Sequence, residues 1–223
     1  MSAYDNKSQS YFGIPRREML EFIPTGVSSV LEIGCGAGAF GALVKQQLGC
    51  RYTGVELMSQ AAELARARLD EVIVANIEQT PLPFPQENFD CLVCNDVLEH
   101  LIDPWTALRT LTGFLRPGGY VVISLPNVRF SEVVKNLVVR KRWEYEQEGV
   151  LDRTHLRFFT ESSMRTLFES AGLEILQLRG INAIKYAWRL RLLNIMLFGA
   201  LSDMRYPQYG CLGQLPVLEG SSS

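Results

Sequence analysis

The architecture of this chain follows from residues 30–38, which read Val30-Leu-Glu-Ile-Gly-Cys-Gly-Ala-Gly38. The apolar residues at the start of this run predict a buried parallel strand, and the glycines let the backbone turn sharply and approach a ligand closely. Residues 39–48 then show the apolar spacing of a helix. Open α/β sheets bind nucleotide-like ligands where a strand ends in such a loop. We therefore predict an α/β fold with a ligand of this kind at the loop.

Glu32 indicates which ligand the loop binds. A carboxylate just before the first glycine repels a pyrophosphate and attracts a cation. S-adenosylmethionine (SAM) carries an ammonium and a sulfonium but no phosphate, so Glu32 favours this cofactor. The glycines alone leave the choice open, because Gly34, Gly36 and Ala39 also satisfy the G-x-G-x-x-G/A pattern of dinucleotide-binding proteins. A nicotinamide-dependent oxidoreductase and a glycine turn that serves packing alone are the alternatives.

A second carboxylate supports a nucleoside ligand without choosing its class. Residues 51–56 read as a strand that ends at Glu56, about twenty residues after the glycines. A carboxylate at this place binds ribose hydroxyls in both cofactor classes.

Length and composition are those of one globular domain. The chain has 223 residues, of which 47% are hydrophobic and 21% charged, with a formal net charge of −2. This charge gives no global case for nucleic-acid binding. The N-terminus lacks an apolar secretory core, and residues 192–201, the longest apolar stretch near the C-terminus, are too short to span a bilayer. Together with five scattered cysteines, these features predict a cytoplasmic protein, with the inner membrane surface as an alternative location within the cytoplasm.

Cys91 and Cys94 form a C-x-x-C pair that invites a redox or zinc interpretation. The pair lies inside an apolar strand pattern, where residues three apart point to opposite faces of the sheet. No second pair completes a metal site. We therefore expect two buried free thiols and no bound metal.

Strand and helix patterns alternate along the chain, which predicts a parallel sheet with helices on both faces. The predicted strands are 28–33, 51–56, 71–75, 89–94, 120–125, 173–180 and 207–215. The predicted helices are 15–23, 39–48, 59–69, 104–114, 130–139 and 160–171. Ser59 and Asp103 are the expected N-caps of two helices, and Arg116-Pro-Gly-Gly119 is expected to turn the chain into strand 120–125.

The regular alternation is interrupted twice after strand 120–125. Residues 127–158 form a basic, aromatic insertion that we interpret as a lid. Residues 183–201 form an amphipathic stretch that we interpret as a second cap or contact helix. We expect a mobile N-terminal segment at 1–14, a single domain at 15–218 and a flexible tail at 219–223.

Four segments, in the expected order, resemble the class I SAM-dependent methyltransferases. They are VLEIGCGAG (30–38), TGVEL (53–57), VANIEQTPLPFPQENFDCLVCNDVLEHL (74–101) and LRPGGYVVISLPN (115–127). The resemblance implies a Rossmann-like, seven-stranded, mostly parallel sheet of order 3-2-1-4-5-7-6 with an antiparallel seventh strand. A shorter segment, DRTHLRFFT (152–160), resembles a subgroup that accompanies saccharide and cell-envelope biosynthesis.

The resemblance also implies the contacts with SAM and with its product S-adenosylhomocysteine. Glu32 and the glycines would surround the methionine part, and Glu56 would bind the ribose hydroxyls. Asn76, where the family more often has Asp, would accept a hydrogen bond from the exocyclic amine of adenine. Arg16 matches a position near the cofactor carboxylate in related proteins. The implied cofactor residues are Arg16, Glu32, Gly34, Gly36, Gly38, Glu56, Leu57, Met58, Asn76, Ile77, Asn95 and Asp96.

Catalysis places few demands on the protein, because methyl transfer from a sulfonium has a good leaving group and needs mainly proximity and alignment. A base is needed only for a poor nucleophile such as a sugar hydroxyl. The chain has two histidines. His155, in the insertion, is the first candidate for this base and His100 the second, and each can instead be a structural histidine. Glu99 and Asp96 are lesser candidates.

We therefore expect methyl transfer from SAM to a small molecule, with a hydroxyl of a saccharide or cell-envelope precursor as the leading acceptor. Transfer to nitrogen and a non-catalytic SAM-binding partner protein are the alternatives. The basic residues of the insertion form either a solvated face or a grip on an anionic acceptor group. Nucleic acid is an unlikely partner. Residues 183–201 suit a peripheral membrane contact or a subunit contact, in a monomer or a homodimer.

Overall fold

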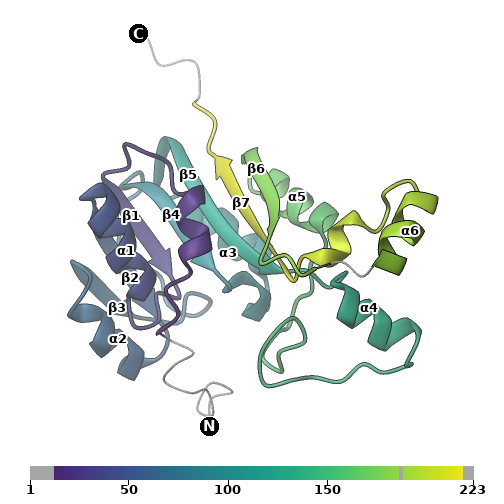
Figure 1. Cartoon of the computed structure of the whole chain (residues 1–223). Helices are drawn as coiled ribbons and strands as arrows, with labels where there is room; N and C mark the ends of the chain where they lie inside the picture. Colours follow the sequence, from purple (N-terminus) through teal and green to yellow (C-terminus); the bar gives the residue numbers. More distant parts are fainter. Residues whose placement is uncertain (1–12, 186–187, 218–223) are drawn as a thin grey trace.

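A central sheet of seven strands organises the protein (Figure 1). The computed structural model describes residues 13–185 and 188–217. The expected mobile segment, up to residue 12, and the expected tail at 219–223 lie outside the described residues. The strands are β1 Ser29–Ile33, β2 Arg51–Glu56, β3 Glu71–Val74, β4 Phe89–Asn95, β5 Leu115–Pro126, β6 Glu174–Ile181 and β7 Gln208–Gln214.

The strand order is β3-β2-β1-β4-β5-β7-β6, as the resemblance implied. β7 pairs antiparallel with both β5 and β6, and the other pairings are parallel. The central strands β1 and β4 are covered on both faces, so most of their residues are buried. This explains why they read as continuous apolar runs rather than as alternating patterns.

Helices cover both faces of the sheet and create two apolar cores. The helices are α1 Ala39–Leu48, α2 Ser59–Arg66, α3 Pro104–Thr112, α4 Ser131–Val138, α5 Glu161–Ser170 and α6 Trp188–Met196, with 3₁₀ turns at Arg17–Phe22, Leu98–His100 and Ser202–Arg205. One core contains Leu108 of α3 and Cys94 of β4, and the other contains Val44 of α1 and Cys91 of β4. Both cysteines are free and buried. They therefore lie on opposite faces of the sheet, as the strand periodicity predicted.

The N-terminus of α2 differs from the prediction. Ser59, the expected N-cap, is instead the first helical residue, because the carbonyl of Met58 accepts the first helical hydrogen bond from the amide of Ala62 at 3.0 Å. The helix also ends at residue 66 rather than 69. Asp103, by contrast, caps α3 as predicted, since its side chain accepts a hydrogen bond from the amide of Thr106 at 3.0 Å.

Two other predicted elements change type. The segment Arg116-Pro-Gly-Gly119 lies within β5 instead of forming a turn. A register shift between Phe89 and Cys91 of β4 accommodates it, because a bulge admits extra residues without ending the strand. The predicted helix 15–23 is a shorter 3₁₀ helix that begins after Arg16, whose backbone is left-handed with a φ of 42°.

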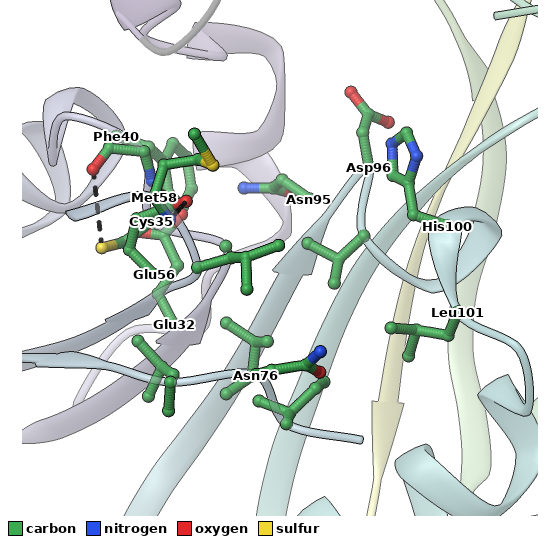
Figure 2. A pocket seen from close by; sticks show the side chains of 18 of the residues that line it. Glu32, Cys35, Phe40, Glu56, Met58, Asn76, Asn95, Asp96, His100 and Leu101 are labelled. Atoms are coloured by element: carbon green, nitrogen blue, oxygen red, sulfur yellow. Dashed lines mark hydrogen bonds between the residues drawn. The ribbon is translucent and has the colours of Figure 1, made fainter. Parts of the chain in front are cut away.

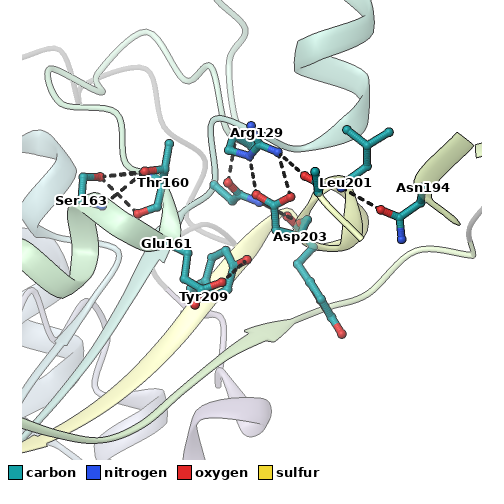
Figure 3. Close-up of polar contacts among 11 residues, drawn as sticks. Arg129, Thr160, Glu161, Ser163, Asn194, Leu201, Asp203 and Tyr209 are labelled. Carbon is teal, nitrogen blue, oxygen red and sulfur yellow. Dashed lines mark hydrogen bonds and ion pairs between the residues drawn. The ribbon is translucent and has the colours of Figure 1, made fainter. Parts of the chain in front are cut away.

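The insertion and the C-terminal region meet at one end of the sheet, where Figure 1 places both α4 and α6. Arg129 of the insertion forms an ion pair with Asp203 and donates to the carbonyl of Ala200 at 2.8 Å (Figure 3). Asn127 donates to the carbonyls of Asp203 and Tyr206. Arg129 therefore joins these two regions. Among the helices of the described residues, none combines the length and the apolar character that a bilayer span requires.

Candidate cofactor and acceptor site

The glycine loop after β1 makes the turn that the sequence predicted. Gly34, Gly36 and Gly38 all have positive φ angles, between 54° and 75°, in a backbone region that residues with a Cβ enter only with strain. Space is restricted as well, because a Cβ added at Gly34 would lie 2.5 Å from Cγ2 of Val97. The loop requires glycine for both reasons.

A cavity of about 330 Å³ opens beside this loop, at the carboxyl ends of β1, β2 and β4 (Figure 2). Ligands bind open α/β sheets at this edge, and the volume is within the usual range for ligand pockets. Gly38 does not line the cavity, because it caps α1 and faces Ala65 of α2. The other residues assigned to the cofactor do line it: Arg16, Glu32, Gly34, Gly36, Glu56, Leu57, Met58, Asn76, Ile77, Asn95 and Asp96.

Glu56 is held at the end of β2 by two backbone amides. Gly36 donates to its Oε2 at 2.8 Å and Met58 donates to its Oε1 at 2.9 Å. Burial raises the pKa of the Glu56 carboxyl, although these amide hydrogen bonds act in the opposite direction. The carboxyl group is thus fixed in orientation before any ligand binds, with further lone pairs on both oxygens.

Two buried polar groups in the cavity lack partners within the described part of the chain. They are Oε2 of Glu32 and the side-chain amide of Asn95. Burial, with a smaller contribution from the Glu56 carboxyl, raises the pKa of Glu32 to about 8, although the neighbouring Tyr52 side chain acts in the opposite direction. Figure 2 shows the amide of Asn95 directed across the cavity toward Met58. Buried polar atoms are rarely left unpaired, so both groups indicate a ligand site.

Asn76 follows β3 on another side of the cavity, beside Ile77. Its Oδ1 accepts a hydrogen bond from the amide of Glu78 at 3.0 Å. This bond fixes the side-chain amide and leaves Oδ1 with a second lone pair. Asn76 can therefore still accept a hydrogen bond from an amine.

Arg16 enters the cavity from the N-terminal side and is held by several partners. It forms ion pairs with Asp96 and Glu18, and it donates to Oγ of Ser124 at 3.2 Å. Asp96 has a positive φ of 53° and also accepts from Ser124 at 2.8 Å. Arg16 and Asp96 thus form one fixed group at the end of β4 and β5, and each offers only part of its hydrogen-bonding capacity to a ligand.

The two histidines lie together, but only one of them lines the cavity. His100 does so, whereas His155 is buried behind it, with the two ring centroids 4.7 Å apart. Nδ1 of His100 lies 3.1 Å from the carbonyl oxygen of Thr154, and Nδ1 of His155 lies 3.0 Å from that of Val150. This placement favours His100 over His155 as the residue that meets an acceptor, the reverse of the order that we inferred from the sequence.

Several cavity residues carry no recognisable sequence signal. Phe40 of α1 and Leu101 line the cavity, yet each reads as an ordinary core residue of an apolar segment. Only the folded chain shows that these side chains form its walls.

Known proteins resemble this chain in sequence and in structure. The ubiquinone biosynthesis O-methyltransferase of Aeromonas salmonicida is 26% identical over 163 residues, which cover 69% of this chain and 66% of that protein. The enzyme of the same name from Albidiferax ferrireducens is 29% identical over 137 residues, which cover 55% and 54%. The chain thus spans between half and two thirds of the length of these relatives.

The fold is shared with solved structures at lower sequence identity. A SAM-dependent methyltransferase from Archaeoglobus fulgidus superposes with a TM-score of 0.66 at 18% identity, and the superposition covers 93% of this chain and 94% of the other. The sequence profile of the methyltransferase domain family matches residues 9–178, well over half of the chain. The glycine loop, the cavity at the strand ends and this match lead to one conclusion: the chain belongs to the methyltransferase domain family and has the fold of the class I SAM-dependent methyltransferases.

Proposed function

We propose that the protein transfers a methyl group from SAM to a hydroxyl of a small-molecule acceptor, with a saccharide or cell-envelope precursor as the leading class. The observation that carries this proposal is the presence of buried, unpartnered polar atoms of Glu32 and Asn95 in the cavity, as judged over the described residues. A ligand with a positive charge compensates an ionised Glu32, whereas a pyrophosphate would place negative charge against it. SAM supplies this positive charge, whereas NADH brings a negatively charged pyrophosphate.

The same cavity supplies groups for the nucleoside part of SAM. Glu56 binds the ribose hydroxyls through the lone pairs that Gly36 and Met58 leave available. Asn76 accepts from the exocyclic amine of adenine, with Ile77 beside the ring. When bound, SAM supplies the electrophilic methyl group. The protein's own residues bind it, orient it and exclude water from it.

His100 is the residue that we assign to the acceptor proton. A carbonyl oxygen can only accept, so the contact with Thr154 places the hydrogen on Nδ1 of His100. Nε2 then carries the lone pair that a base needs. Removal of the acceptor proton by this nitrogen matters most for an alcohol, which is a poor nucleophile when neutral.

Two observations bear on the acceptor class. The relatives described above are named O-methyltransferases, which supports transfer to oxygen. The segment at residues 152–160, which carries His155, supports a saccharide or envelope precursor through its resemblance to that subgroup.

Five free, buried cysteines agree with a cytoplasmic location. We assign the insertion at 127–158 the role of a lid over the acceptor, within a single domain at 15–218.

The exposed side chains around α6 support the contact with a membrane surface or a second subunit that we expect for residues 183–201. Ile195, Met196 and Phe198 are large apolar side chains that are largely exposed. Exposed apolar clusters of this kind are typical of interaction surfaces. A vesicle co-sedimentation experiment and a size measurement in solution separate a membrane contact from a homodimer contact.

Calorimetric titration with SAM, S-adenosylhomocysteine and NADH in parallel tests the cofactor. We expect the first two to bind and NADH not to bind, and binding of NADH alone would overturn the proposal. Incubation with methyl-deuterated SAM then tests the acceptor in three panels: phenols and catechols, nucleotide sugars and lipid-linked saccharides, and small amines. Label found only in the amines would show that the acceptor atom is nitrogen and not oxygen. Tight SAM binding without label in any panel would favour a non-catalytic partner protein.

A further inference from the structure

Glu99, His100 and His155 form a compact cluster next to the cavity. One possible ligand atom from each lies within 4.8 Å of the other two. Glu99 and His100 belong to the 3₁₀ turn that follows β4, and His155 comes from the insertion. The amides of Leu156 and Arg157 donate to the carbonyl of Glu99 and hold the two segments together. Glu99 and His100 are adjacent in the sequence, but His155 is 55 residues further along, so no ligand spacing predicts the complete cluster.

Glu99 is the least satisfied member of the cluster. Its side chain is 0% exposed, and neither carboxyl oxygen has a hydrogen-bond partner among the described residues. Nε2 of His155 lies 3.9 Å from Oε1 of Glu99, too far for a hydrogen bond. Two ligands of one zinc ion at tetrahedral geometry lie about 3.4 Å apart. The gap therefore suits an ion between the two atoms better than a direct bond.

The backbone orients both imidazoles in the way that metal-binding histidines require. Nδ1 of His100 donates to the carbonyl of Thr154, and Nδ1 of His155 donates to the carbonyl of Val150. Histidines that bind metal almost always donate their other ring N–H to a carbonyl or a carboxylate, which fixes the tautomer and the ring direction. Both Nε2 atoms then carry the lone pair that a metal needs.

The charges around the cluster also favour a cation. Glu99 and Asp152 are both buried carboxyl groups. The cation that acts on Glu99 is Arg16, and Arg16 is already ion-paired with Asp96. Buried carboxylates are stabilised by pairing or by coordination to a metal. His100 lines the cavity and so connects the cluster with solvent.

We propose that Glu99, His100 and His155 bind one divalent transition-metal ion of the Zn²⁺, Fe²⁺ or Co²⁺ type. Two imidazoles and one carboxylate suit these ions, whereas Mg²⁺ and Ca²⁺ prefer oxygen ligands alone. Three protein ligands leave further coordination positions open. Nε2 of His100 cannot hold an ion and accept the proton of the acceptor at the same time, so the base role that we assign to His100 belongs to the metal-free protein. Metal binding at this cluster does not require methyl transfer, so it can be tested whatever the acceptor is.

The full chain, without a histidine tag, is stripped with a chelator and titrated with Zn²⁺ and then with Co²⁺. We expect one equivalent of Zn²⁺ by calorimetry and visible Co²⁺ bands without a thiolate charge-transfer band, because all five cysteines are buried. The chain has only two histidines, so the imidazole proton resonances of both should shift together with Zn²⁺. Glu99→Gln and His155→Asn should each weaken Zn²⁺ binding by more than about 100-fold, the upper range for loss of a mere supporting residue.

Glu169→Gln is the matched control, because Glu169 is an exposed carboxylate on α5. It should bind Zn²⁺ as the unchanged chain does. Glu99→Gln keeps the size of the buried side chain, and circular dichroism with SAM titration verifies that it folds. Zn²⁺ binding that is equal in the unchanged chain and in both site variants, a thiolate band with Co²⁺, or imidazole resonances that do not move would each overturn the proposal.

Discussion

The backbone amide of Gly36 donates to Oε2 of Glu56 at 2.8 Å and so joins the glycine loop after β1 to the end of β2. The two residues are twenty positions apart, and the strands that lead to them, β1 and β2, are parallel neighbours. This bond makes the loop and the carboxylate one rigid unit on the cavity wall. A ligand that contacts both meets a site that is already formed, which reduces the entropy lost on binding.

Glu56→Gln should lower the affinity for SAM by about 10- to 100-fold. The amide has only one acceptor oxygen, so it cannot serve Gly36, Met58 and a ribose together, and the loss of charged hydrogen bonds of about 1.5–3 kcal/mol sets the magnitude. Calorimetry with SAM measures the change. Glu63→Gln, at an exposed carboxylate on α2, is the control and should bind normally. Equal affinities for the two variants would remove Glu56 from the cofactor site.

Glu32→Gln should change the pH dependence of folding stability. The folded-state pKa of Glu32 is about 8, above its ordinary value of 4.5. Between these values the folded state keeps a proton that the unfolded state has released, so the contribution of Glu32 is full below pH 4.5 and is lost as the pH rises through 8.

Urea unfolding at several pH values measures this contribution. Between pH 5.5 and 7.5 the free energy of unfolding of the unchanged chain should carry a slope from Glu32 of about −1.4 kcal/mol per pH unit, which Glu32→Gln removes. The same variant should bind SAM more weakly, because the ligand's positive charge loses its partner. An unchanged slope would show that Glu32 ionises normally, and unchanged SAM affinity would show that its charge does not act on the cofactor.

Gly34→Ala should destabilise the protein by about 2–4 kcal/mol, because left-handed strain adds to overpacking. The new methyl group would lie 2.5 Å from Cγ2 of Val97 at a φ of 69°. Gly49→Ala is a close control, since Gly49 has a φ of 66° but open space around its Cα. This substitution should lower the free energy of unfolding by only about 1–2 kcal/mol, because it adds backbone strain without a steric clash. If chemical denaturation shows that both variants lose the same free energy of unfolding, Val97 must move aside.

His100→Gln should lower kcat by about 10²- to 10⁴-fold while the dissociation constant of SAM stays the same, because only the acceptor proton is affected. Single-turnover assays with the acceptor found in the labelling experiment measure the rate. Added imidazole should restore part of the activity by replacing the missing base. Loss of folding stability together with loss of activity, and no effect of imidazole, would indicate a structural histidine instead.

Trypsin should cleave the free protein first in the insertion, after Arg140, Lys141 or Arg142, which lie in an exposed segment after α4. If residues 127–158 form a lid, SAM together with an acceptor should slow this cleavage, because closure orders the segment. Mass spectrometry of the first fragments locates the cuts. Cleavage at the same rate with saturating ligands would remove the lid role.

The sequence by itself determined the sheet and the cofactor edge. Periodicity located the strands, because buried parallel strands leave apolar runs and glycine loops leave an unmistakable pattern. The order of the strands and the antiparallel β7 came from resemblance, because no local pattern encodes which strands pair. Most residues that line the cavity could be named because they lie at or just after strand ends, where chain position and spatial position coincide.

Tertiary structure alone decided what surrounds those residues. The segment at 116–119 lies between Leu115 and Tyr120, which both pair with β4, and it forms the irregularity at the register shift there; the isolated Pro-Gly-Gly sequence does not predict this. The order of His100 and His155 as candidates also depended on packing, since the insertion folds back and buries His155 behind His100. Glu99 read as a minor candidate, and only its burial and the approach of His155 from the distant insertion make it part of a cluster. Local patterns record the neighbours along the chain, whereas burial and long-range contacts set the charge and the partners of each side chain.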